Sequence, residues 1–167
     1  YRMQRLALAA QRFFALPADD ERQPQYARFC TRHASWLDDY ALFMALAERF
    51  NWQDWGDWEP RLVRREQQAL DQAAVELAGE IIFWKFCQWC FFRQWRSLKQ
   101  YANERGVRII GDIPIYVAFD SSDVWCRQDQ FKLNEDGSPA VSAGVPPDYF
   151  SKTGQLWGNP IYNWEKM

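Results

Sequence analysis

The chain has 167 residues, with 20 basic and 22 acidic side chains and a formal net charge of −2. Both signs are interspersed and no long single-sign run occurs, which speaks against nucleic acid or an anionic membrane as a partner. The apolar run over residues 81–92 is interrupted by Lys85 and Gln88. It is shorter than the roughly 20 residues that span a bilayer.

Aromatic residues make up 17% of the chain and include ten tryptophans, which is the outlier of the composition. Part of this content is expected to pack in a core. The remainder offers flat ring surfaces to a polar ligand with an apolar face, such as a carbohydrate.

The two ends of the sequence predict that it is an internal piece of a longer protein. Tyr1 opens the chain without an initiator methionine, inside a helical pattern, and residues 164–167 close it without a stop signal. Size points the same way, because the helix expected around residues 81–92 is apolar on nearly every side. Such a helix is usually covered by more protein than 167 residues provide.

The chain has four cysteines, Cys30, Cys87, Cys90 and Cys126. Cys87 and Cys90 lie three apart in a helical pattern, as a metal or redox pair would. No second pair or companion histidine stands at ligand spacing, since His33 is the single histidine. We therefore expect buried, reduced thiols of a cytoplasmic protein, with no metal and no cofactor.

The periodicity of apolar residues predicts a mostly helical first two thirds. Helices are expected over residues 1–15, 25–50 (as one helix or two), 61–77 and 80–105. Pro17 lies in a polar loop, residues 51–60 form a loop with three tryptophans, and Gly79 marks a kink or break.

The segment after the last helix predicts one unit of an α/β barrel. Gly106 is placed to stop the helix, residues 107–111 form a short β-rich run, and Asp112 follows at its carboxyl end. Reacting groups of (β/α)8 barrels lie at that end of the strands. Asp112 is therefore a candidate for binding a substrate hydroxyl, with capping of its own loop as the equal alternative. A single strand has no backbone partner, so the rest of the sheet is expected outside this chain.

Two short structures are predicted between the barrel unit and the next motif. Ser121 or Asp120 is expected to cap a helical turn that leads to Trp125. Further on, Asp136 and Gly137 separate two β-like runs and predict a hairpin.

The long segment over residues 144–162 is the strongest candidate for a sugar site. Rings could pack on the C–H face of a sugar, while carboxylate and amide groups could bind the hydroxyl rim. Long loops of this kind are more often functional than not. The alternative is that the rings fold back and pin the loop. The candidates for substrate binding, together with Asp112, are Tyr116, Asp148, Tyr149, Phe150, Gln155, Trp157 and Asn159.

Glycosyl chemistry needs two carboxyl groups that flank the bond, and a retaining enzyme holds them roughly 5–5.5 Å apart. No such pair can be named in this sequence. Glu48, Glu59, Glu66 and Glu80 all fall within helices or at their edges. The chain therefore shows a substrate half-site and no catalytic residue.

Three motifs resemble the amylomaltase family, the 4-α-glucanotransferases or disproportionating enzymes. They are RIIGDIPIYVA over residues 108–118, DSSDVW over 120–125 and GVPPDYFSKTGQLWGNP over 144–160. The helix with QW at 88–89 and FFRQW at 91–95 is similar too, whereas residues 1–49 are less distinctive. The likeness to bacterial maltodextrin-metabolising members suggests a bacterial cytoplasmic protein.

The resemblance implies a (β/α)8 barrel with large insertions, of which this chain would be a mostly helical α/β part. It implies transfer of α-1,4-glucan segments between maltooligosaccharides, with retention and through a covalent glucosyl-enzyme. Asp112 matches a substrate-site residue at the end of an early barrel strand. The segment around Asp148 and Trp157 matches a loop that holds glucan and acceptor. The three catalytic carboxylates of the family lie beyond the WGNP segment, so none is assigned here.

The resemblance also predicts how the chain is divided. Residues 1–78 would form a largely helical insertion, and residues 79–167 a barrel helix, a barrel strand and substrate-binding loops. Without the catalytic carboxylates, this polypeptide alone is expected to be inactive and to expose apolar surface. Two competing classes remain open, a non-catalytic glucan-binding module and a helical interaction protein with a tryptophan-rich surface.

Overall fold

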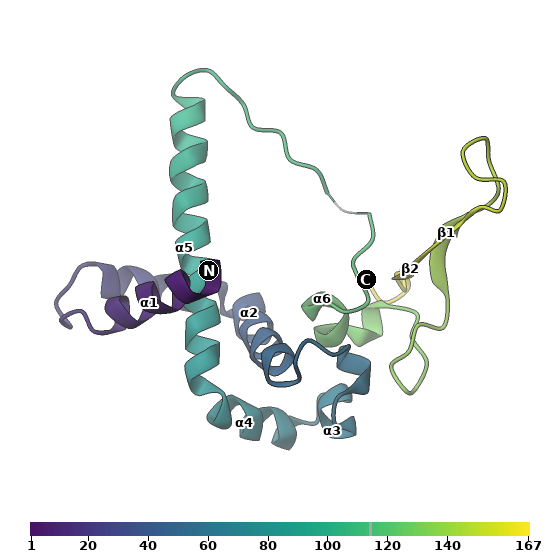
Figure 1. Ribbon diagram of the computed structural model, residues 1–167, viewed down its shortest axis with the longest axis horizontal. Coiled ribbons are helices and arrows are strands. Elements are labelled where there is room, and N and C mark those ends of the chain that lie inside the picture. Colours follow the sequence, from purple (N-terminus) through teal and green to yellow (C-terminus); the bar gives the residue numbers. More distant parts are fainter. Residues whose placement is uncertain (114) are drawn as a thin grey trace. The chain divides into compact units, whose positions relative to one another are not determined.

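A computed structural model describes residues 1–113 and 115–167 of the chain, and these are mostly helical (Figure 1). Pro114, inside the RIIGDIPIYVA motif, lies outside the described residues. The α-helices are α1 (Arg2–Phe14), α2 (Arg22–Arg49), α3 (Pro60–Val63), α4 (Gln67–Glu76), α5 (Ala78–Asn103) and α6 (Ser122–Cys126). Two 3₁₀ turns, η1 (Trp55–Asp57) and η2 (Gln128–Gln130), and two strands, β1 (Ser142–Val145) and β2 (Gln155–Pro160), complete the structure.

The contacts divide the chain into two compact units. The first unit comprises residues 1–45 and 74–112, and the second comprises residues 46–73 and 113–167. Each unit therefore draws on both sides of position 78. The predicted boundary between residues 78 and 79 refers to the fold of the longer protein, and it stays a prediction.

The core of the first unit is an aromatic cluster shared by α1, α2 and α5. Phe13 of α1 lies 4.9 Å from the ring of Trp89 and 5.2 Å from that of Phe86, both on α5. Phe29 and Leu37 of α2 are buried in the same cluster. Phe86 and Trp89 are three residues apart and therefore lie on one face of α5, and this face is buried because it packs in the cluster.

Three of the predicted helices, α1, α2 and α5, keep their expected limits closely. α2 is one continuous helix, and α5 ends before Gly106, which has a φ of 73°. The N–H of Gly106 donates to the carbonyl of Asn103, and that of Val107 to the carbonyl of Ala102, at 3.0 Å each. A left-handed glycine that closes a helix in this way confirms the predicted stop.

Tryptophans form the core of the second unit. Trp55 and Trp125 are fully buried, and Trp58 is 3% exposed. The indole N–H of Trp125 donates to the carbonyl of Leu62 at 3.0 Å, and its ring lies 5.8 Å from that of Trp58. The predicted tryptophan loop is thus partly a 3₁₀ turn, and Trp55 and Trp58 pack inward from it while Trp52 is exposed.

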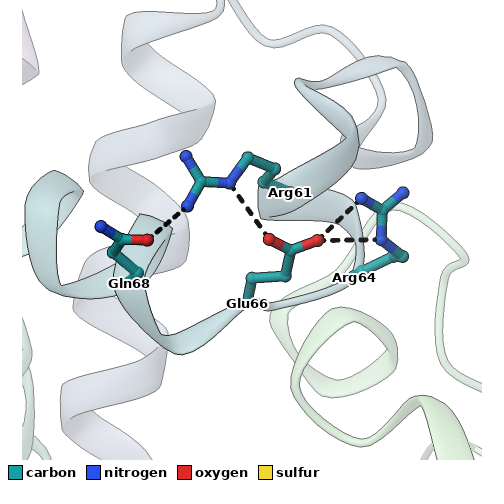
Figure 2. A network of polar contacts seen from close by, with 4 residues as sticks. All are labelled: Arg61, Arg64, Glu66 and Gln68. Carbon is teal, nitrogen blue, oxygen red and sulfur yellow. Dashed lines mark hydrogen bonds and ion pairs between the residues drawn. The ribbon is translucent and has the colours of Figure 1, made fainter.

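The helix predicted over residues 61–77 is divided into α3 and α4. The break lies at Arg65, which has a φ of 53° and holds its guanidinium carbon 4.2 Å from the ring centre of Trp125. Around it, Arg61 and Arg64 both pair with Glu66, at 3.1 and 2.7 Å (Figure 2). The two guanidinium groups donate hydrogen bonds to the Glu66 carboxylate and hold its pKa below its usual range. The sequence predicts a further break at Gly79. In the structure this break lies two residues earlier, between α4 and α5.

The sheet consists of β1 and β2, which pair antiparallel, with Gly144 opposite Leu156 and Val145 opposite Gln155. Residues 144–162 were expected to lack regular structure, so this hairpin corrects that expectation. The short hairpin predicted around Asp136 is confirmed. It is closed by a bridge between Leu133 and Pro139 and by the N–H of Asn134, which donates to the Ser138 carbonyl at 2.8 Å.

Residues 107–111 form no strand in this structure, unlike the sequence-based expectation. Val107 is 57% exposed and Ile110 is 92% exposed. A strand exists only where a neighbouring chain segment binds its backbone groups, and β1 and β2 bind each other. Incorporation of this segment in a barrel sheet stays a prediction.

No helix among residues 1–113 and 115–167 is long and apolar enough to cross a membrane. All four cysteines are thiols, and they are half-buried, not fully buried as expected. Burial raises the pKa of the Cys87 thiol to about 11.

Candidate substrate site

The candidate site is built on the β1–β2 hairpin, and two glycines allow its strands to approach. A Cβ at Gly144 would lie 2.4 Å from the carbonyl oxygen of Gln155, and one at Gly154 would lie 2.5 Å from that of Val145. Gly154 also has a φ of 75°, which favours glycine. The sequence therefore needs glycine at both positions to bring residues 146–154 out as a connection between the strands.

Asp148 organises the end of this connection. Its Oδ1 accepts the N–H of Phe150 at 2.9 Å and that of Ser151 at 2.7 Å, and its own N–H donates to the Ser151 carbonyl at 2.9 Å. The Ser151 hydroxyl donates to the carbonyl of Gly154 at 2.6 Å. This is an aspartate turn, in which the side chain takes the place of a backbone partner. The sequence predicts that Asp148 contacts the sugar. In the structure, the same carboxylate also holds the turn.

The turn displays two aromatic rings to solvent. Tyr149 is 95% exposed and Phe150 is 89% exposed, and their rings are nearly perpendicular at 5.6 Å between centres. Large rings normally gain free energy from burial, so rings exposed on an ordered turn are suited to binding. The alternative that these two rings fold back and pin the loop does not hold in this structure.

A second group of predicted residues gathers on β2. The ring of Trp157, 45% exposed, lies 6.1 Å from that of Tyr116, and its indole N–H donates to Oε1 of Gln155 at 3.0 Å. Asn159 Nδ2 donates to the backbone carbonyl of Val117 at 2.8 Å. β2 is thereby tied to residues 116–117, and the structure brings together Tyr116, Gln155, Trp157 and Asn159.

Asp112 belongs to a different unit from the other candidates. It is the last residue of the first unit and is exposed, whereas the other predicted site residues belong to the second unit. Its predicted role at the end of a barrel strand therefore rests on the sequence alone.

The residues after Val117 are held by a tryptophan that the sequence did not single out for the site. The indole N–H of Trp55 donates to the carbonyl of Phe119 at 2.8 Å, and the two rings lie 5.0 Å apart. Ser121 caps α6 as predicted, since its Oγ accepts the N–H of Val124 at 3.4 Å. Partial burial raises the pKa of the Asp120 carboxyl, and the charge of Asp54 adds to this shift. Only the position of Trp55 in a loop rich in tryptophan signalled its anchoring role.

The described residues offer no ligand set for a metal ion. Among residues 1–113 and 115–167, no three or more histidine, cysteine, aspartate or glutamate side chains are grouped as metal ligands would be.

Asp148 allows a test that separates its two roles. In the whole protein, we expect Asp148→Ala to speed hydrogen exchange of the Phe150 and Ser151 amides, because both amides lose their acceptor. We also expect it to lower, several-fold, kcat/KM for the transfer between maltooligosaccharides that the sequence resemblance implies. Asp148→Asn keeps an acceptor oxygen and should preserve most of both properties. A lower kcat/KM with unchanged exchange at these two amides would instead assign Asp148 to the substrate alone.

An exposed aromatic turn and an aromatic and amide cluster on the same hairpin have the side-chain types that the sequence predicts for a carbohydrate site. The sequence profile of the 4-alpha-glucanotransferase family matches residues 1–167, and the chain belongs to that family. It is 51% identical over 156 residues to the 4-alpha-glucanotransferase of Thermus thermophilus, which covers 93% of this chain and 31% of the relative. With that of Aquifex aeolicus the identity is 50% over 138 residues, covering 83% of this chain and 28% of the relative.

A solved structure shares the fold as well. The amylomaltase from Streptococcus agalactiae in complex with acarbose matches with a TM-score of 0.91 and 41% identity. The match covers 99% of this chain and 33% of that chain. The present chain thus spans about a third of the length of the relatives it matches.

Proposed function

We propose that the protein containing this chain is a 4-alpha-glucanotransferase that moves α-1,4-glucan segments from one maltooligosaccharide to another. The proposal is supported by membership of the family and by relatives that bear this name. A solved relative in complex with acarbose supports a carbohydrate ligand. The observation that carries the proposal is the display of Tyr149 and Phe150 on an ordered turn, at 95% and 89% exposure.

In this proposal the chain supplies binding and orientation. The rings of Tyr149, Phe150 and Trp157 pack on the C–H faces of glucose units. Gln155 and Asn159 each use part of their amide group in a hydrogen bond, to Trp157 and to Val117 respectively. The remaining donors and acceptors of both amides bind sugar hydroxyl groups. Asp112 binds a further hydroxyl from the end of a barrel strand.

Bond cleavage is assigned to carboxylates beyond this chain. Transfer with retention proceeds through a covalent glucosyl-enzyme and needs a nucleophile and an acid/base roughly 5–5.5 Å apart. A (β/α)8 barrel in a cytoplasmic protein is the setting that we propose for them. The catalytic role of the present residues is then to favour a sugar acceptor over water.

Trp157 tests this role, because a ring over the acceptor excludes water from the glucosyl-enzyme. We expect Trp157→Ala in the whole protein to raise the share of hydrolysis several-fold. The measurement is the number of reducing ends formed from maltotriose, since transfer conserves that number and hydrolysis adds one for each bond cleaved.

Trp157→Phe is the matched control, because it keeps a ring beside Tyr116 while it removes the hydrogen bond to Gln155. It should remain close to the unchanged protein. An unaltered share of hydrolysis in Trp157→Ala, together with a lower unfolding midpoint, would show that Trp157 only pins the loop.

A further inference from the structure

A groove of about 840 Å³ lies on the first unit, between the first turns of α2 and the middle of α5. Four of its lining residues are arginines, Arg28 and Arg32 from α2 and Arg93 and Arg96 from α5. We refer to it as the arginine groove. Its volume lies in the range of small-molecule sites, roughly 300–1,000 Å³.

The surroundings of the arginine groove carry positive charge without compensation. Residues 22–37 and 81–103 contain no aspartate or glutamate, although the whole chain has a net charge of −2. In the described part of the chain, the four arginines take part in none of the ion pairs formed. Lys85, a further cation of α5, pairs with Asp38 and not with the groove.

The spacing of the four arginines favours the binding of an anion. Arg28 and Arg32 are four apart on one helix, and Arg93 and Arg96 are three apart on the other, so each pair lies on one helical face. Like charges at these spacings repel each other. An anion in the groove would relieve the repulsion at all four guanidinium groups.

The floor of the groove is aromatic. Phe29 and Trp89 are buried there, while the half-buried rings of His33 and Phe92 lie 5.5 Å apart. The guanidinium carbon of Arg93 lies 4.9 Å from the ring centre of Trp89, which fixes this cation at the floor.

His33 adds a hydrogen-bond donor. Its Nδ1 accepts the indole N–H of Trp36 at 3.3 Å. The neutral imidazole therefore carries its proton on Nε2, where it can donate to a ligand.

We propose that the arginine groove binds a small phosphate-bearing organic molecule, either a nucleotide or a sugar phosphate. The forked guanidinium groups match phosphate oxygens, and they do so with two hydrogen bonds each where geometry permits. The rings of His33 and Phe92 provide an apolar surface for the base or the sugar. This ligand differs from the neutral glucans of the proposed transfer reaction, and the groove involves none of the residues assigned to them.

The test is calorimetric titration of the whole protein with ATP, with glucose 1-phosphate and with inorganic phosphate. We expect saturable binding of at least one of the two organic phosphates, tighter than inorganic phosphate and weakened by added salt. The double variant Arg32→Gln and Arg96→Gln removes two positive charges but keeps polar side chains, and it leaves Arg93 on Trp89. Its affinity should fall by about tenfold or more, the expected loss of charge-assisted hydrogen bonds.

The matched control is the double variant Arg2→Gln and Arg127→Gln, which removes the same charge from exposed positions outside the groove. Its affinity should stay within about twofold of the unchanged protein, given the small effect of distant exposed charges. Preference for ATP over glucose 1-phosphate would assign the groove to nucleotides, and the reverse preference to sugar phosphates.

Three results would overturn the proposal. One is the absence of binding heat with all three phosphates, and another is an equal loss of affinity in both double variants. The third is self-association of the unchanged protein in sedimentation that Arg32→Gln with Arg96→Gln abolishes, since the groove would then be a contact between two copies.

Discussion

Trp125→Ala is expected to lower the free energy of unfolding by about 3–5 kcal/mol, as large-to-small changes of buried aromatic residues do. Trp125 is fully buried, and its ring packs against Trp58 and under the guanidinium group of Arg65. The change also leaves the carbonyl of Leu62 without its indole donor. The measurement is denaturant unfolding of the whole protein, followed by fluorescence.

Trp164→Ala is the control, because Trp164 is 73% exposed and contacts the ring of Tyr162 at 5.3 Å. Its effect should stay within about 0.5 kcal/mol, the usual range for surface positions. Equal effects of the two substitutions would mean that Trp125 does not hold the core of the second unit.

The helices of this chain could be predicted from the sequence because their signals are local. Gly106 and Ser121 mark a helix end and a helix cap within a few residues of the structure they define. α1, α2 and α5 likewise follow the period of their apolar residues. The division between α3 and α4 escaped prediction because it depends on Arg65 reaching Trp125, a contact between residues sixty positions apart.

The strands were predicted poorly because a segment becomes a strand only when another segment pairs with its backbone. Residues 107–111 have the composition of a strand, yet no strand among the described residues pairs with them. β1 and β2 have glycine and proline at and near their ends, which weakens the β signal, yet they pair with each other. A close approach at Gly144, visible only in three dimensions, makes that pairing possible.

The candidate site was predicted by residue type and motif, and the structure added its geometry. The sequence named Tyr116 and Trp157 separately, and the structure places their rings in contact. It also shows that Asp148 holds the turn, which no residue pattern had indicated. The arginine groove was missed because Arg32 and Arg96 are far apart in the chain and meet only where α2 and α5 pack together.

The double variant Tyr149→Ala and Phe150→Ala is expected to lower kcat/KM for maltotriose disproportionation by roughly tenfold to a hundredfold. Each ring face is worth about 0.5–1.5 kcal/mol in packing contacts beyond area, and about 1.4 kcal/mol corresponds to a factor of ten. The unfolding midpoint should not change, because both rings are almost fully exposed and contact each other. Initial rates and denaturant unfolding of the same preparations provide the two measurements.

Leu156→Ala is the matched control on the same hairpin. Leu156 is 80% exposed, but side chains alternate along a strand, so it points away from the face that carries Gln155 and Trp157. Its kcat/KM should remain within about twofold of the unchanged protein, as for a surface position. If Leu156→Ala reduced kcat/KM as strongly as the double variant, the apolar character of the hairpin and not the two rings would bind the glucan. If neither variant changed kcat/KM, the exposed turn would have no part in substrate binding, and the proposed site would have to be given up.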